Sequence, residues 1–100
     1  MCALNRMSRK KMVDAHGRPY FLWDVDMTLV RFEELLHHPE SGTRAAALGK
    51  LLRQARPDDV FTFVSEATIR AEWPRIEGYL GKTRDFWRWL LATWQEQDVA

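Results

Sequence analysis

Two aspartates and a threonine alternate along the segment 24–28, directly after the apolar run of residues 21–23. Paired carboxylates of this kind can serve nucleophilic or acid–base chemistry in a catalytic site. They can also accept backbone N–H bonds at the positive end of a helix dipole. Because a helical pattern starts at residue 28, we expect Asp24 and Asp26 to cap the helix that follows.

The same segment resembles motif I of haloacid-dehalogenase-type phosphatases, Asp-x-Asp-x-Thr after an apolar run. The resemblance implies that Asp24 is a nucleophile, that Asp26 is a general acid/base, and that both lie with Thr28 near a Mg²⁺ ion. Residues 61–65 are similar to the second motif, but the later motifs are missing. About 70 residues follow Thr28, too few for the sheet of such an enzyme. We therefore expect no catalytic residues, with a Mg²⁺-dependent phosphatase fragment as an alternative.

The sequence offers little for a metal or redox site. Cys2 is the only cysteine, which excludes an internal disulfide and a cysteine-based zinc site. His16, His37 and His38 lack the spacing of a metal-ligand set, so we expect no metal and no cofactor. No apolar run approaches the roughly 20 residues of a membrane span, and the first residues lack the apolar core of a signal peptide. A cytoplasmic protein without a membrane partner is expected.

The charge is nearly balanced over the whole chain, at +1, but not along it. The first 18 residues hold five Lys and Arg against one Asp, and we expect residues 1–15 to form a basic, flexible arm. Lys50, Arg53 and Arg56 fall opposite the apolar face of a predicted helix. Because clustered cations bind phosphates, these features support a DNA-associated regulator as an alternative function.

Helical periodicity dominates the chain from residue 28 onward. Two runs have apolar residues at helical spacing: Leu29, Phe32, Leu35 and Leu36, and then Ala45, Leu48, Leu51, Leu52 and Ala55. The first helix should end before Pro39, because the residue preceding a proline avoids the α conformation. The second should begin at Ser41 or Thr43, since both are good N-caps.

The pattern between residues 57 and 81 is less regular. Residues 57–59, Pro-Asp-Asp, predict a helix start. We expect that helix to continue through residues 60–64, although this stretch is also β-branched and aromatic enough for a strand. A further helical face over residues 69–80 contains Pro74, which should kink or divide it. Gly81 is expected to close that element as its C-cap.

The most regular helical pattern belongs to residues 83–97. An arc of about 140° at helical pitch holds the expected core residues Phe86, Trp87, Leu90, Leu91 and Trp94. Trp89 lies outside this arc, which makes it the leading candidate for a partner contact. The expected fold is all-α, a compact bundle of four or five short helices over residues 16–100, with residues 20–23 as a short N-terminal strand or an extended segment.

Taken together, several short motifs resemble an uncharacterised prokaryotic family of small helical domains, often encoded beside nucleotidyltransferase toxins of the AbiEii type. The aromatic-Trp-Asp-x-Asp opening of that family is matched by residues 22–26, and its closing Leu-turn-Phe-Trp by residues 80–87. The likeness covers about residues 19–94, with departures at Gly81 and Pro74. The resemblance implies a non-catalytic module whose opening aromatic segment docks against the last helix.

The expected function is therefore a small, non-catalytic, intracellular protein-interaction module, an antitoxin-like or regulatory component. Its expected partner is another protein, either a toxin or a second copy of the chain. Trp89 is the expected contact residue on this interpretation. In the DNA-associated alternative the contact candidates are Lys50, Arg53 and Arg56.

Overall fold

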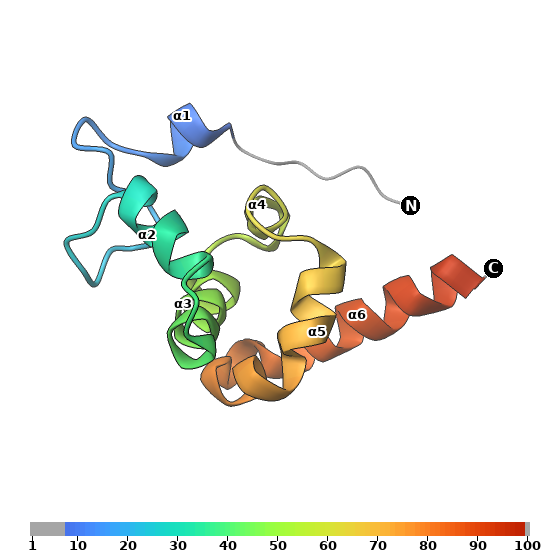
Figure 1. The fold of residues 1–100 in the computed structure, drawn as a ribbon. Coiled ribbons are helices and arrows are strands. Elements are labelled where there is room, and N and C mark those ends of the chain that lie inside the picture. The colour runs from blue at the N-terminus through green and yellow to red at the C-terminus, as the bar shows by residue number, and fades with distance from the viewer. Residues whose placement is uncertain (1–7, 100) are drawn as a thin grey trace.

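The fold consists of helices joined by short turns. A computed structural model describes residues 8–99, and the side chains of residues 8–93 (Figure 1). In chain order the elements are the helices α1 (Arg9–Met12), α2 (Leu29–Leu36), α3 (Ser41–Gln54), α4 (Pro57–Val60) and α5 (Glu66–Ile76), the 3₁₀ turns η1 (Glu77–Tyr79) and η2 (Gly81–Thr83), and the helix α6 (Arg84–Val99). Residues 8–99 contain no β-strand, so the predicted all-α bundle is confirmed.

Helix α3 lies at the centre of the molecule and packs against α2, α4, α5 and both 3₁₀ turns. The core residues predicted for this helix are all buried, including Ala55, which is its C-cap: Ala45, Leu48, Leu51, Leu52 and Ala55. Helix α2 buries Leu29, Phe32 and Leu36 against the same core, as its periodicity predicts. The apolar faces of α2 and α3 therefore pack together in one hydrophobic core.

Helix α4 is shorter than the sequence predicts. It begins at Pro57 but ends at Val60, and the residues that follow form turns rather than a continued helix or a strand. The N–H of Phe63 donates to the carbonyl of Val60 at 3.0 Å, a turn bond rather than a helical one. Ser65 then caps α5 by accepting from the N–H of Thr68. The prediction that the helix continues through residues 60–64 was wrong, because α4 ends at Val60 and Ser65 caps the start of a new helix.

Pro74 does not divide α5. The helix continues to Ile76 and then tightens into η1, so the change of geometry comes two residues after the proline. Proline lacks an N–H, which removes one helical bond without ending the helix here. Gly81 has φ +53°, a left-handed conformation suited to glycine, but it is not the C-cap that was expected: Leu80 is the C-cap of η1, and Gly81 follows it as the first residue of η2.

Helix α6 begins at Arg84 and packs mainly through its first half. Trp87 and Leu91 are buried, as predicted, and the indole N–H of Trp87 donates to the carbonyl of Leu52 at 2.9 Å. Leu90 is half-buried, whereas Phe86, expected in the core, is exposed. The predicted core residue Trp94 lies outside the described side chains. The second half of α6 runs out past α5 (Figure 1).

The N-terminal segment joins the bundle through the buried side chain of Met12 and through Arg9, which pairs with Glu33 of α2 and lies over the ring of Phe63. Met12 of α1 is buried in the core, so the packing of the domain begins before the predicted boundary at residue 16. Val13 and Pro19 form an isolated antiparallel bridge, and the residues after Pro19 turn rather than continue as a strand. The predicted arm of residues 1–15 lies partly outside the described residues, which begin at Ser8.

Gly49 of α3 allows η1 to pack closely, and its replacement should destabilise the protein. A Cβ at Gly49 would lie 2.5 Å from the Cβ of Tyr79, so one backbone would have to move. We expect Gly49→Ala to lower the free energy of unfolding by about 1–3 kcal/mol. Gly42→Ala in the same helix meets nothing closer than 3.7 Å and should be neutral or slightly stabilising. Urea denaturation of both variants tests the contact, and equal stabilisation would contradict it.

Candidate functional site

Asp24, Asp26 and Thr28 each bind a different partner, so their side chains do not converge on one site. Asp24 accepts from Lys50 Nζ at 2.6 Å and from the amide of Gln54 at 3.3 Å, which ties the N-terminal loop to α3. The hydrogen bond from Lys50 holds the pKa of the Asp24 carboxyl below its ordinary value. Asp26 pairs with Arg18 at 3.3 Å.

The N-cap of α2 is Thr28, whose hydroxyl accepts from the N–H of Arg31 at 3.2 Å. The expectation that Asp24 and Asp26 cap this helix was therefore wrong. The two carboxylates instead form ion pairs with Lys50 and Arg18, and residue 24 lies in a turn rather than at a strand end. The arrangement that the phosphatase resemblance implies for Asp24, Asp26 and Thr28 is not assembled. Within residues 8–93, no group of three His, Cys, Asp or Glu side chains could hold a metal ion.

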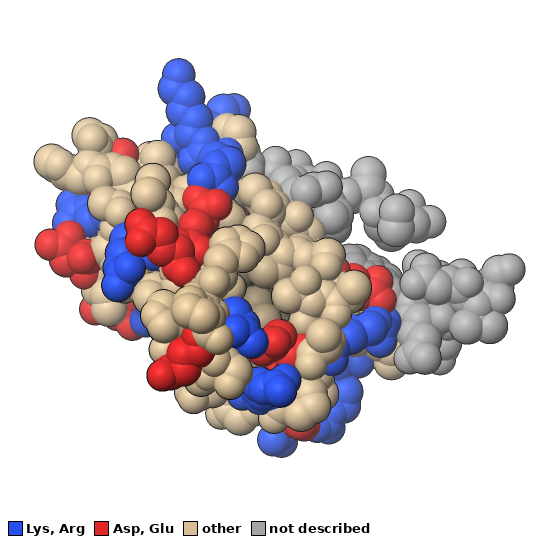
Figure 2. Space-filling view, viewed as in Figure 1, with Lys and Arg blue, Asp and Glu red and all other residues tan. Residues whose placement is uncertain are grey.

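The cations of the DNA-binding alternative also have partners within the chain. Lys50 pairs with Asp24, Arg53 donates to the backbone carbonyl of Tyr79, and Arg56 pairs with Asp59 at 3.0 Å. Arg56 is the N-cap of α4 and does not belong to α3. Figure 2 shows Lys and Arg interspersed with Asp and Glu over the visible face. The three residues therefore do not form the single basic helix face that their spacing predicts.

A buried carboxylate, Asp59, organises a network that the sequence analysis missed. Asp59 is fully buried in α4, where it accepts from the Tyr20 hydroxyl at 2.7 Å and from Arg56 Nε at 3.0 Å. The Tyr20 hydroxyl in turn accepts from the backbone N–H of Arg56 at 2.9 Å. Tyr20 and Asp59 are 39 residues apart, so no local pattern could reveal this contact. The network attaches the N-terminal loop to α4.

Burial, and then the hydrogen bond to Asp59, raise the pKa of Tyr20 to about 12. Because this pKa is raised above the ordinary value of about 10, the network contributes its full stability below about pH 10. That contribution is lost as the pH rises from about 10 to about 12. In a Tyr79→Phe variant Tyr20 is the only tyrosine, and its ultraviolet titration should show a midpoint near 12. Adding Asp59→Asn should lower that midpoint, and an unchanged midpoint would contradict the network.

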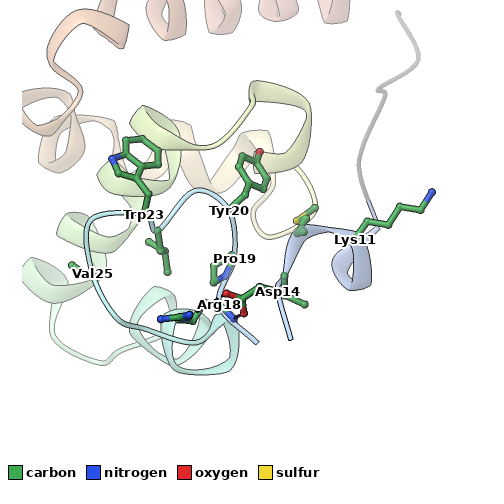
Figure 3. A pocket seen from close by; sticks show the side chains of 10 residues that line it. Lys11, Asp14, Arg18, Pro19, Tyr20, Trp23 and Val25 are labelled. Carbon is green, nitrogen blue, oxygen red and sulfur yellow. Dashed lines mark hydrogen bonds and ion pairs between the residues drawn. The ribbon is translucent and has the colours of Figure 1, made fainter. Parts of the chain in front are cut away.

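A hollow of about 430 Å³ lies against the N-terminal loop (Figure 3). It is lined by Lys11, Met12, Val13, Asp14, Arg18, Pro19, Tyr20, Leu22, Trp23 and Val25. Figure 3 shows Arg18 and Asp14 meeting beside Pro19, and Arg18 Nε donates to Asp14 at 3.2 Å. These charges neutralise each other and hold the loop, whereas Trp23 is 70% exposed at the edge of the hollow.

The position of Trp23 differs from what the family resemblance implies. The opening aromatic segment was expected to dock against the last helix, but Trp23 is exposed. The ring of Phe21 contacts that of Phe63, and the ring of Trp87 contacts that of Phe61. The turn between α4 and α5 therefore lies between the opening segment and α6.

Two exposed aromatic side chains of α6, Phe86 and Trp89, contact each other, and we call this pair the aromatic patch. Trp89 is 60% exposed and Phe86 40% exposed, and their ring centroids are 6.1 Å apart. The prediction that Trp89 lies outside the core is confirmed. Beside it, a groove of about 320 Å³ between α5 and α6 is lined by Arg70, Trp73, Arg88, Leu91 and Ala92.

Comparisons with known proteins return no relatives. The chain matches no protein-family model, no curated protein and no solved structure. None of the helices over residues 8–99 combines the length and the apolar character that crossing a bilayer demands. The geometry described above therefore carries the functional argument.

Proposed function

We propose that this chain is a non-catalytic protein-interaction module whose contact surface is the aromatic patch of α6. The observation that carries the proposal is the exposure of Trp89 at 60%, in ring contact with Phe86 at 40%. Large aromatic side chains dominate the binding energy of protein interfaces, because they bury much area with few rotatable bonds. Two of them in contact on one helix face are a suitable centre for such an interface.

The core does not require the side chain of Trp89. Trp87, between the two patch residues in sequence, is fully buried and makes the hydrogen bond to Leu52. The core side of α6 is thus filled by Trp87 and Leu91 without any contribution from Trp89. A single exposed apolar side chain needs no explanation, but two exposed aromatic rings in contact form a contiguous apolar surface of the kind that binds a partner.

The finer proposal is that the module is an antitoxin-like or regulatory component whose partner is a toxin or a second copy of the chain. The support for it is the resemblance over residues 22–26 and 80–87. Identification of a nucleotidyltransferase among the bound proteins would support the toxin partner. Any other partner would leave only the broader proposal.

Quantitative affinity purification from the native cells tests the proposal. We expect at least one protein, or a second copy of the chain, to be recovered with the wild-type chain and lost with Trp89→Ala. Val30→Ala is a matched control, because Val30 is an apolar side chain with 67% exposure on α2. Recovery that is equal for wild type, Val30→Ala and Trp89→Ala would overturn the proposal.

A further inference from the structure

Four exposed cations that pair with no carboxylate lie where α5 meets α6. Most Lys and Arg side chains among residues 8–93 form an ion pair with an Asp or Glu of the chain. The exceptions in this part of the chain are Lys10 and Lys11 on α1, and then Arg53, Arg75, Lys82 and Arg84. The last four residues belong to α3 or to the segment 75–84, which leads from α5 through η1 and η2 into α6. We call these four residues the basic end.

Backbone contacts hold the basic end together. Arg53 of α3 donates to the carbonyl of Tyr79, the last residue of η1, and α3 packs against both 3₁₀ turns. Because a 3₁₀ turn rises only about 2 Å per residue, positions 75 and 84 are separated by less than about 18 Å along the chain. Figure 2 shows Lys and Arg side chains along the lower edge of the visible face, where α5 and α6 meet in Figure 1.

The basic end keeps an excess of positive charge. Glu77 of η1 pairs with Arg88, so these two charges cancel. Asp85 is the only acid of the described segment 75–88 that forms no ion pair with the chain, and it stands against four cations. Since no ion pair holds these four cations, an anion can bind them without breaking a salt bridge of the fold.

An exposed aromatic ring belongs to the same region. Tyr79 is 45% exposed, while its backbone is fixed by Arg53 and by the close approach of its Cβ to Gly49. Its hydroxyl forms no hydrogen bond with residues 8–93. Cations around an exposed ring are typical of surfaces that bind single-stranded nucleic acid, because the bases stack on the ring while the cations hold the phosphates. Three of the four cations are arginines, whose planar fork of donors matches the geometry of a phosphate.

We infer that the basic end binds single-stranded nucleic acid without sequence preference, with the phosphates on its four cations and a base stacked on Tyr79. An acidic protein segment would meet the same cations but would have no use for the ring. The inference goes beyond the proposed function and does not depend on the aromatic patch. Because the whole chain carries a net charge of only +1, we expect a dissociation constant in about the micromolar range at low salt.

Fluorescence anisotropy of a labelled oligothymidylate of about 12 nucleotides tests the role of the ring with the full chain. At about 50 mM salt, we expect Tyr79→Ala to weaken binding at least about fivefold, because it removes the stacking surface. This variant keeps the Cβ that packs against Gly49. Tyr79→Phe keeps the ring and should bind like the wild type. Trp23→Ala removes a more exposed ring from the N-terminal loop and should also leave the affinity unchanged.

The salt dependence of the affinity tests the cations. Arg75→Gln and Lys82→Gln should each reduce the slope of log affinity against log salt concentration by about 0.7, the contribution of one phosphate contact with a single strand. Lys10→Gln is the matched control, because Lys10 is also exposed and without a carboxylate partner among the described residues, but lies on α1. It should leave the slope unchanged.

Several outcomes would overturn the inference. They are the absence of binding by the wild type, equal or tighter binding of a duplex of the same length, and equal losses with Tyr79→Ala and Tyr79→Phe. Displacement of the oligonucleotide by polyglutamate at equal charge would also overturn it, and would assign the basic end to an acidic protein instead. The proposed function is tested separately, since it depends on Trp89 and on the recovery of a protein partner.

Discussion

Truncation of Trp87 to alanine should lower the free energy of unfolding by about 3–5 kcal/mol, the range for a large aromatic side chain removed from a core. Trp87 is fully buried, contacts the rings of Phe61 and Phe86, and satisfies its indole N–H at the carbonyl of Leu52. Its loss removes buried apolar area, leaves a cavity and deprives that carbonyl of a donor. The cost is a large part of the 5–15 kcal/mol that stabilises a typical domain.

Trp89→Ala is the matched control, two residues further along the same helix. Its side chain is 60% exposed, and we expect a change of less than about 1 kcal/mol. Urea denaturation followed by circular dichroism measures both variants, because the remaining tryptophans complicate a fluorescence signal. Equal costs at the two positions would show that α6 is rotated from the orientation described above.

Truncation of Phe21 should have a comparable effect, about 3–5 kcal/mol. Phe21 is fully buried, and its ring meets those of Tyr20, Phe32 and Phe63 at centroid distances of 5.4, 5.6 and 5.9 Å. These contacts join the N-terminal loop to α2 and to the turn after α4. Phe21→Ala therefore removes the side chain that connects three parts of the bundle.

Trp23→Ala serves as the control for the loop. The Trp23 side chain is 70% exposed, so its removal should cost less than about 1 kcal/mol. The amide of Gln54 donates to the backbone carbonyl of Phe21 at 2.6 Å, and both variants retain this acceptor. A large loss of stability with Trp23→Ala and a small loss with Phe21→Ala would contradict the packing of this segment.

The faces of α2, α3 and α6 could be predicted because their burial follows directly from periodicity. Leu48, Leu51 and Leu52 repeat at helical spacing, and a helix with such a stripe must bury it. The same reasoning separated Trp87 from Trp89, which differ by about 200° around α6 at helical pitch. The orientation of the aromatic patch was thus accessible from the sequence, apart from Phe86, which lies at the exposed edge of the predicted arc.

The end of α4 could not be predicted, because the apolar stripe continues across it. Val60, Phe63 and Val64 have helical spacing although the helix ends at Val60. Ser65 caps the start of α5, and the rings of the turn before it pack in two directions: Phe61 contacts Trp87, and Phe63 contacts Phe21. Those contacts are set by the tertiary arrangement rather than by the local sequence.

The polar contacts could not be predicted from the sequence either. Asp59 was expected to be an acid at a helix N-terminus, and its burial depends on Tyr20, far away in sequence. Asp24 and Asp26 were judged by their spacing, but their partners, Lys50 and Arg18, come from other parts of the chain. A motif of alternating carboxylates therefore serves here to hold a loop.

Site-specific photocrosslinking tests the central claim, that the aromatic patch contacts another protein chain, most directly. A photoreactive phenylalanine analogue in place of Trp89 should give discrete covalent adducts in native cells, including one of twice the chain mass if the partner is a second copy. The analogue in place of Val30, with 67% exposure on α2, should give none of these adducts. The absence of any adduct from position 89, or the same adducts from both positions, would contradict the account.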